Sequence, residues 1–307
     1  MTLQKVACVS VKIVSFRPPN MSTTARTSST VLQRLREDRP LAAVELRPPR
    51  TGLSSVESME VWIDMYHSIQ RLARRDTLIF LTDNAVGLSE EENLAHLTAN
   101  LAGDVDTRRI VPFLTSKHSL EYCLMHASRA ASRGFEAITV LGGDHTAGPP
   151  RCVPHARELR TLIRRRVPAL DLGGWANPHR PADEQVDFLL DARFEADFYL
   201  TQIVSHHSIG AVERFLTEAR RRGVPYPGVF GVFLYRSANP ATLAKLADFF
   251  PVPAADLTRE FEAGMTPEEI CAKSVRLLRE VGADKVYLSN LGFHEVELRY
   301  RRIAELL

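Results

Sequence analysis

Three short stretches of the chain combine residue types that could do chemistry, and the first of them centres on an acid. In Val44-Glu-Leu-Arg-Pro-Pro-Arg50, Glu45 lies inside a short apolar run that two prolines end. A carboxylate in such a run is unfavourable to bury unless it is paired or acts as an acid or base. Two interpretations stay open from this stretch alone: a working acid, or an edge carboxylate paired with Arg47 or Arg50.

The second stretch is the glycine-rich segment 141–150, Leu-Gly-Gly-Asp-His-Thr-Ala-Gly-Pro-Pro. Gly142 and Gly143 would let a ligand approach the backbone closely, and Asp144 can accept hydrogen bonds from the N–H groups of a heterocycle. The alternative is an ordinary strand-to-helix turn that Asp144 caps.

The third stretch places Thr201 and Gln202 within the apolar run Tyr199–Val204. A glutamine amide there can bind the donor–acceptor edge of a heterocycle, or it can satisfy a neighbouring loop. His206 and His207 follow directly, but neighbouring side chains of an extended segment point apart, and no third ligand stands at a diagnostic spacing. We therefore expect no metal site.

Strand-like runs alternate with helical patterns along most of the chain. The predicted strands are Ala42–Leu46, Thr77–Thr82, Arg109–Leu114, Ala137–Leu141, Ala169–Leu172, Phe198–Val204, Gly228–Leu234 and Lys285–Ser289. The predicted helices are Val56–Ala73, Glu91–Leu101, Leu120–Ser132, Ala156–Arg166, Ala182–Arg193, Ile209–Arg222, Pro240–Phe249, Thr266–Val281 and His294–Leu307, with a helical insertion at Pro253–Glu262.

This alternation predicts a parallel sheet, and its eight units fit a single (βα)8 TIM barrel over residues 41–307. An open doubly wound sheet is the rival, but no strand is followed by the spaced-glycine dinucleotide fingerprint. We expect residues 1–40 to be an N-terminal extension with a short helix over Ser29–Arg39, which Thr30 would cap. Translation could start at Met1 or at Met21.

In a barrel of this kind the chemistry lies at the carboxyl ends of the strands. Besides the three stretches above, this rule selects residues that could contact a cofactor. They are Thr82, Thr115, Gly142, Gly143, Trp175, Asn177 and Tyr235.

The composition narrows the class of protein. A content of 45% apolar and 25% charged residues is typical of a soluble globular protein, and a net charge of +2 does not indicate a nucleic-acid binder. We expect a cytoplasmic protein with no membrane segment, and its four cysteines match no paired metal-binding spacing. The sequence does not fix the oligomeric state.

Three strand ends together resemble the methylenetetrahydrofolate reductase family, whose catalytic domain is an eight-stranded α/β barrel. Residues 44–50 are similar to that family's first-strand motif, in which an acid is followed by Pro-Pro-Arg. Leu141-Gly-Gly-Asp144 is similar to its fourth-strand motif, usually Leu-Arg-Gly-Asp, and Leu200-Thr-Gln202 is similar to its sixth-strand motif. The order and spacing of the three agree.

The resemblance implies reduction of 5,10-methylenetetrahydrofolate to 5-methyltetrahydrofolate, a step of one-carbon metabolism that supplies methionine biosynthesis. It implies that Glu45 is the general acid that opens the folate ring to an iminium, a role that requires a raised carboxyl pKa. Asp144 would hold the pterin edge, and Gln202 would bind the pterin or the nicotinamide amide. The electron donor would be NADH or NADPH, which the sequence does not distinguish.

The chain departs from the family pattern where the family holds FAD. The arginine of the fourth-strand motif is Gly142 here, and Pro112-Phe-Leu-Thr115 replaces the usual Pro-His-Leu-Thr. The usual lysine of the fifth helix is missing from Phe188-Leu-Leu-Asp-Ala-Arg193, which offers Asp191. Either flavin is absent and hydride passes directly to the folate, or FAD binds through other residues such as Arg193 or His179.

Two further interpretations compete with a reductase. One is a catalytically degenerate barrel that binds folate or regulates a partner, although a pure binder has no need of a buried acid. The other is a pterin-using methyltransferase, which predicts a cobalamin or metal site that the sequence does not offer.

Overall fold

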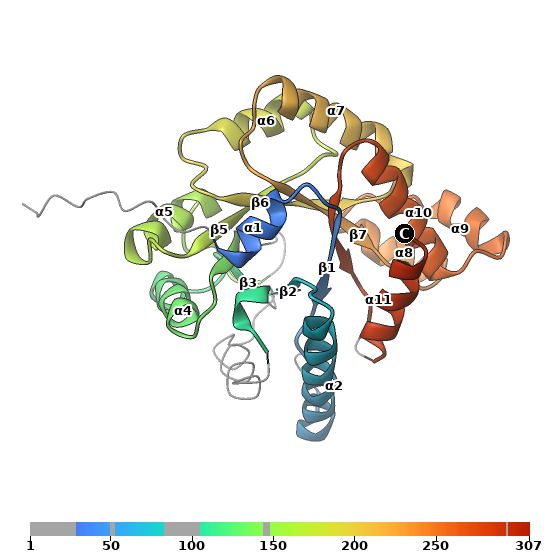
Figure 1. Ribbon diagram of the computed structural model, residues 1–307, viewed down its shortest axis with the longest axis horizontal. Coiled ribbons are helices and arrows are strands. Elements are labelled where there is room, and N and C mark those ends of the chain that lie inside the picture. Colours follow the sequence, from blue (N-terminus) through green and yellow to red (C-terminus); the bar gives the residue numbers. More distant parts are fainter. Residues whose placement is uncertain (1–28, 50–52, 83–104, 144–147, 293) are drawn as a thin grey trace, which may run out of the picture.

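The strands close into one parallel barrel, which confirms the predicted (βα)8 fold (Figure 1). The structure is a computed structural model that describes residues 29–49, 53–82, 105–143, 148–292 and 294–307. The strands are β1 (Leu41–Leu46), β2 (Ile79–Leu81), β3 (Ile110–Thr115), β4 (Ala137–Leu141), β5 (Asp171–Ala176), β6 (Phe198–Val204), β7 (Gly228–Phe233) and β8 (Lys285–Ser289). Each strand pairs with the next in sequence, and β8 pairs with β1.

Helices surround the barrel and connect its strands (Figure 1). They are α1 (Thr30–Arg36), α2 (Ser55–Arg74), α4 (Leu120–Ser132), α5 (Ala156–Arg166), α6 (Ala182–Leu190), α7 (Ile209–Arg221), α8 (Pro240–Ala247), α9 (Ala254–Glu262), α10 (Pro267–Glu280) and α11 (Val296–Glu305). Two 3-10 helices, η1 (Thr107–Arg109) and η2 (His206–Ser208), precede β3 and α7. The helix predicted over Glu91–Leu101 lies outside the described residues.

The apolar core has two layers because successive strand residues face opposite sides of the sheet. Side chains such as Val44 and Leu46 pack outward against the helices. Alternate residues such as Ala43 and Phe80 fill the barrel interior, in one cluster with Leu32 of α1. Glu45 has the register of Ala43 and therefore faces the interior.

Helix α1 closes the amino-terminal end of the barrel. Two carboxylates at the starts of strands accept hydrogen bonds from the N-terminal N–H groups of this helix. The Ser29 nitrogen donates to Oδ2 of Asp171 over 3.2 Å, and the Thr30 nitrogen donates to Oε2 of Glu136 over 2.7 Å. Acids at a helix N-terminus complement its partial positive charge. The helix cap is the hydroxyl of Ser29, which accepts from Leu32 N–H, so the prediction of Thr30 as the cap was wrong.

The fifth strand is the clearest local error of the sequence prediction. It was placed at Ala169–Leu172, whereas β5 runs from Asp171 to Ala176 and contains Gly173 and Gly174. These glycines do not end the strand, because rings pack against their bare backbone: a Cβ added at Gly173 would lie 2.7 Å from the ring of Phe198. Trp175 is therefore inside β5 and faces the interior cluster.

The other differences are shifts of helix and strand ends. Helix α6 stops at Leu190 and not at Arg193, because Oδ1 of Asp191 accepts the backbone N–H of Arg193 in a turn. Within the described ranges, none of the helices is both long enough and apolar enough to cross a membrane.

Candidate functional site

Glu45 lies inside the barrel near the carboxyl end of β1, with 8% of the residue exposed. The hydroxyl of Ser289, at the end of β8, donates to its Oε1 over 3.0 Å. The guanidinium of Arg47 is further away, with Nε 3.4 Å from the same oxygen, and 56% of the Arg47 side chain is exposed. Glu45 is thus paired with Arg47, as the second interpretation predicts, but it is a buried acid and not a carboxylate on a solvated edge.

The electrostatics of this acid favour its protonated form. Burial raises the pKa of Glu45 above its usual value, because the charged carboxylate loses its hydration. Arg47 and the Ser289 hydroxyl act in the opposite direction, but burial is the larger effect. A carboxyl group with a raised pKa keeps its proton to higher pH than an ordinary glutamate and can act as a general acid.

Two aromatic residues of the barrel interior, Tyr287 and Phe80, lie close to Glu45. Tyr287 of β8 is 2% exposed, donates its hydroxyl to the carbonyl of Thr201 over 2.8 Å, and contacts the ring of Phe80 edge-on at 6.0 Å. Gly231 of β7 makes room for it, since a Cβ there would lie 2.5 Å from the Tyr287 hydroxyl oxygen. Burial and the nearby Glu45 raise the pKa of Tyr287 well above its usual value, so it stays protonated.

The barrel brings several of the predicted cofactor contacts to the same end. Thr82 follows β2 and is half-buried, with its hydroxyl donating to the Leu46 carbonyl over 3.3 Å. Thr115 ends β3 and is 2% exposed, and Trp175 packs against the interior cluster. Tyr235 follows β7, and burial raises the pKa of its hydroxyl, so it too remains protonated.

Two cations that the sequence patterns did not indicate lie against the start of the loop after β4: Arg151 from that loop, and Lys117 from the turn after β3. The Arg151 guanidinium donates to the Gly143 carbonyl over 2.6 Å. The same guanidinium lies 2.9 Å from where a Cβ of residue 142 would stand, so Arg151 fills the space that a side chain there would need. The Lys117 side chain lies 2.7 Å from the equivalent position of Gly143, whose φ of +72° suits glycine. Asp144 lies outside the described residues.

The amides of Gln202 and Asn177 make contacts within the protein. Nε2 of Gln202 donates to the Phe249 carbonyl over 3.2 Å, and its Oε1 accepts the Ile203 N–H over 2.9 Å. Oδ1 of Asn177 accepts the N–H of His179 over 3.1 Å, which shapes the loop after β5. Both residues are half-buried and hold neighbouring segments in place.

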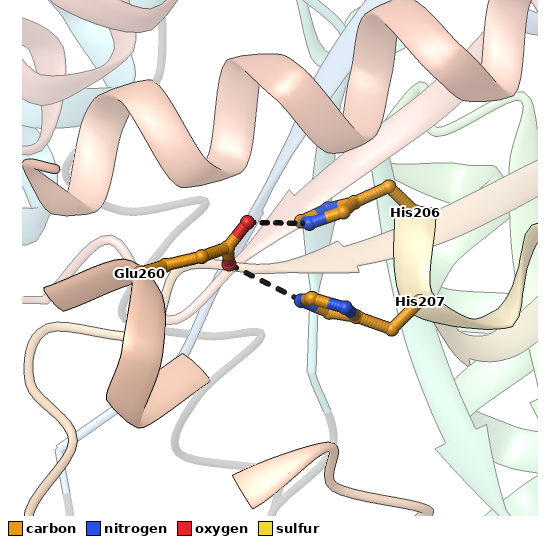
Figure 2. Close-up of side chains that lie close together, drawn as sticks. All are labelled: His206, His207 and Glu260. Carbon is orange, nitrogen blue, oxygen red and sulfur yellow. Dashed lines mark hydrogen bonds and ion pairs between the residues drawn. The ribbon is translucent and has the colours of Figure 1, made fainter. Parts of the chain in front are cut away.

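A second polar cluster lies beside the barrel mouth, and it corrects the sequence prediction. His206 and His207 do not point apart, because they lie in the 3-10 turn η2 and not in an extended segment. Their ring centroids are 3.8 Å apart, and both rings face the carboxylate of Glu260 in α9 (Figure 2). A cavity of about 180 Å³, which His207, His179 and Tyr235 line, adjoins this cluster.

Comparisons with known proteins agree on the barrel. No protein-family model and no curated protein matches the chain. The chain is similar in structure to an uncharacterized protein from Clostridium thermocellum that binds two copies of 5-methyl-5,6,7,8-tetrahydrofolic acid. The TM-score is 0.61 and the sequence identity is 15%, and the match covers 89% of this chain and 96% of that one. The carboxyl transferase domain of Rhizobium etli pyruvate carboxylase has a TM-score of 0.52 and 12% identity, over 84% of this chain and 41% of that one. At these identities the likeness shows the fold.

Proposed function

We propose that the protein reduces 5,10-methylenetetrahydrofolate to 5-methyltetrahydrofolate with a reduced nicotinamide, and that Glu45 is the general acid. The observation that carries this proposal is a buried carboxyl group of raised pKa at the carboxyl end of a barrel strand. The first-strand motif around Glu45 and the folate bound by the structurally similar Clostridium thermocellum protein support a folate as the substrate.

The chemistry needs one proton and one hydride. Glu45 donates its proton to N10 of the folate, and the bond between N10 and the bridging methylene carbon breaks. The methylene carbon remains bound to N5 as an iminium. Hydride from C4 of the nicotinamide then adds to this carbon, which becomes the N5-methyl group, and the nicotinamide is oxidised. The Glu45 carboxylate is protonated again from solvent before the next turnover.

We further propose that hydride passes directly from the nicotinamide, because two positions considered for flavin binding, Asp191 and His179, are engaged with other parts of the protein. Where the reductase family has a lysine for the flavin phosphates, this chain has Asp191, a negative charge. Both Asp191 oxygens are already bound by arginines: Arg193 contacts each of them, and Arg157 Nη1 lies 2.9 Å from Oδ2. His179, one of the two residues considered for binding FAD, instead contacts the Ile203 carbonyl through Nε2 at 2.7 Å.

An isotope experiment separates direct from flavin-mediated transfer. We expect NADH or NADPH carrying deuterium at the transferred position of C4 to place one deuterium in the product methyl group when the reaction runs in ordinary water. A flavin intermediate would exchange its N5 hydrogen with solvent and lose the label. The absorbance spectrum of the purified protein provides a second test: a yellow, flavin-loaded protein that washes the label out refutes direct transfer.

A folate-binding barrel without catalysis is the second candidate, and the Clostridium thermocellum protein, which binds two copies of a methylated folate, favours it. The two candidates differ in turnover. If neither NADH nor NADPH is oxidised with methylenetetrahydrofolate, while 5-methyltetrahydrofolate still binds by calorimetry, the reductase proposal fails and the binding role is supported.

A further inference from the structure

Three side chains from two separate parts of the chain converge at one point beside the barrel mouth. Nε2 of His206 lies 2.8 Å from Oε1 of Glu260, and Nε2 of His207 lies 3.2 Å from Oε2. The candidate ligand atoms of the three residues all lie within 4.8 Å of one another. Figure 2 shows the two rings side by side, with both Nε2 atoms directed at the carboxylate. The side chains of His206 and Glu260 are only 6% and 11% exposed.

The surroundings of His206 allow its Nε2 to be the nitrogen with the lone pair. When the Ser274 hydroxyl donates to the Ile270 carbonyl, 3.3 Å away, its oxygen can accept from Nδ1–H of His206, 2.8 Å away. In a neutral ring the other nitrogen, Nε2, then carries no hydrogen. This lone pair faces a carboxylate oxygen, and a proton or a metal ion has to lie between two acceptors at such a distance.

We propose that His206, His207 and Glu260 form a binding site for a Zn²⁺ ion. Two imidazole nitrogens and one carboxylate are a ligand set that zinc uses, with metal–ligand distances of about 2.0–2.2 Å. Two donors around a tetrahedral ion stand roughly 3.3 Å apart on those distances, so the His206–Glu260 pair needs to open by about half an ångström. The Ser274 hydroxyl holds the first ring through Nδ1, the outer contact that orients metal-bound histidines.

The site also has an open side. His207 lines the cavity of about 180 Å³, so a water molecule or a small ligand can reach the fourth coordination position from there. The two histidines lie in the turn after β6, and Glu260 lies in α9, a helix of the insertion between β7 and β8. A bound ion would therefore fasten this insertion to the barrel. The inference does not depend on the reductase proposal, since it concerns neither Glu45 nor folate.

Two charged neighbours face the cluster and influence the ion. The ammonium of Lys273, on α10, lies 2.7 Å from Oε1 of Glu260, where it competes with a metal ion. Its side chain is 38% exposed and can turn toward solvent. The Asp256 carboxylate lies 3.8 Å from Nδ1 of His207 and adds negative charge that favours a cation. We expect Lys273→Met to bind Zn²⁺ more tightly than the wild type.

The test is a Zn²⁺ titration of metal-free full-length protein in competition with a chromogenic zinc chelator. We expect one ion per chain for the wild type. Ser274→Ala should weaken binding roughly 10–100-fold, as losses of outer contacts do, and His207→Gln and Glu260→Gln should each weaken it by more than about 100-fold. His179→Gln is the matched control, because His179 lines the same cavity but binds the Ile203 carbonyl.

A spectroscopic measurement on the wild type does not depend on how the variants fold. Co²⁺ in place of Zn²⁺ should give visible absorption bands of a four- or five-coordinate ion, and added Zn²⁺ should remove them. The proposal is overturned if the wild type takes up no ion at stoichiometric Zn²⁺. It is equally overturned if His207→Gln and Glu260→Gln, folded by circular dichroism, bind as the wild type does, because the histidines and the carboxylate are then held by protons alone.

Discussion

Replacing Glu45 with glutamine removes the proton donor and leaves the shape of the site. The amide oxygen can still accept from the Ser289 hydroxyl, which now lies 3.0 Å from Oε1, so the side chain keeps its position. A positioned general acid contributes about 10²–10⁴-fold to a rate, or roughly 3–5 kcal/mol of transition-state stabilisation. We expect Glu45→Gln to lose kcat by that factor with little change in KM, because the lost proton transfer occurs only in the transition state.

The same substitution should lower activity without lowering the stability of the fold. The pKa of Glu45 is raised in the folded protein, so between the ordinary and the raised pKa the folded chain holds a proton that the unfolded chain has released. The stability that this proton gives is fully present below the ordinary pKa and is lost as the pH rises through the raised pKa. Glutamine carries no charge at any pH. We expect Glu45→Gln to be at least as stable as the wild type at neutral pH, and its advantage to disappear in acid.

The assay is nicotinamide oxidation with methylenetetrahydrofolate, together with urea unfolding at neutral and at acidic pH. Glu184→Gln is the control, since this carboxylate is exposed on α6 far from the barrel interior. Full activity of Glu45→Gln would refute its assignment as the acid. A variant that is less stable than the wild type at neutral pH would refute the argument that burial raises the pKa of Glu45.

Three further substitutions test the surroundings of the site. Ser289→Ala removes a hydrogen bond that lowers the pKa of Glu45, so the fall of kcat/KM with rising pH should move to higher pH. Gly231→Ala places a methyl group 2.5 Å from the hydroxyl oxygen of Tyr287 and should lower the free energy of unfolding by about 1–3 kcal/mol in urea. Arg160→Leu removes the hydrogen-bond donors to the buried backbone carbonyls of Phe194 and Val140 and should lower the Tm in calorimetry. Each carbonyl left without a partner costs roughly 1–3 kcal/mol.

The barrel could be predicted from the sequence because its determinants are local. Most strands are runs of branched and aromatic residues between helical patterns, and such runs are recognisable without their neighbours. The fifth strand was misplaced because Gly173 and Gly174 weaken that pattern, whereas in the fold they accommodate rings from Phe198 and Phe194. A contact with a distant segment decided the local structure there.

The sequence predicted single residues of the candidate sites, but not the side chains that surround them. Glu45 stood out as an acid in an apolar run, but its partner Ser289 lies 244 residues away along the chain. An extended segment would direct the two adjacent histidines apart, and Glu260, the third member of their cluster, is 54 residues from His206 in an insertion helix. Arg151 reaches Gly143 across a loop that no motif describes. Side chains such as these meet only after the barrel has closed.

The two groups that oppose the raised pKa of Glu45 act through different physics, and salt should separate them. Arg47 acts mainly through its charge, because its hydrogen bond to the acid is long, at 3.4 Å, and its guanidinium is largely exposed, so dissolved ions screen most of its effect. The Ser289 hydroxyl makes a buried hydrogen bond of 3.0 Å that salt does not screen. Arg47→Met should shift the alkaline fall of kcat/KM to higher pH at low ionic strength and much less at high ionic strength. The shift in Ser289→Ala should persist at both. If the Arg47→Met shift is equally large in high salt, the guanidinium acts chiefly through its hydrogen bond to the acid and not through its charge.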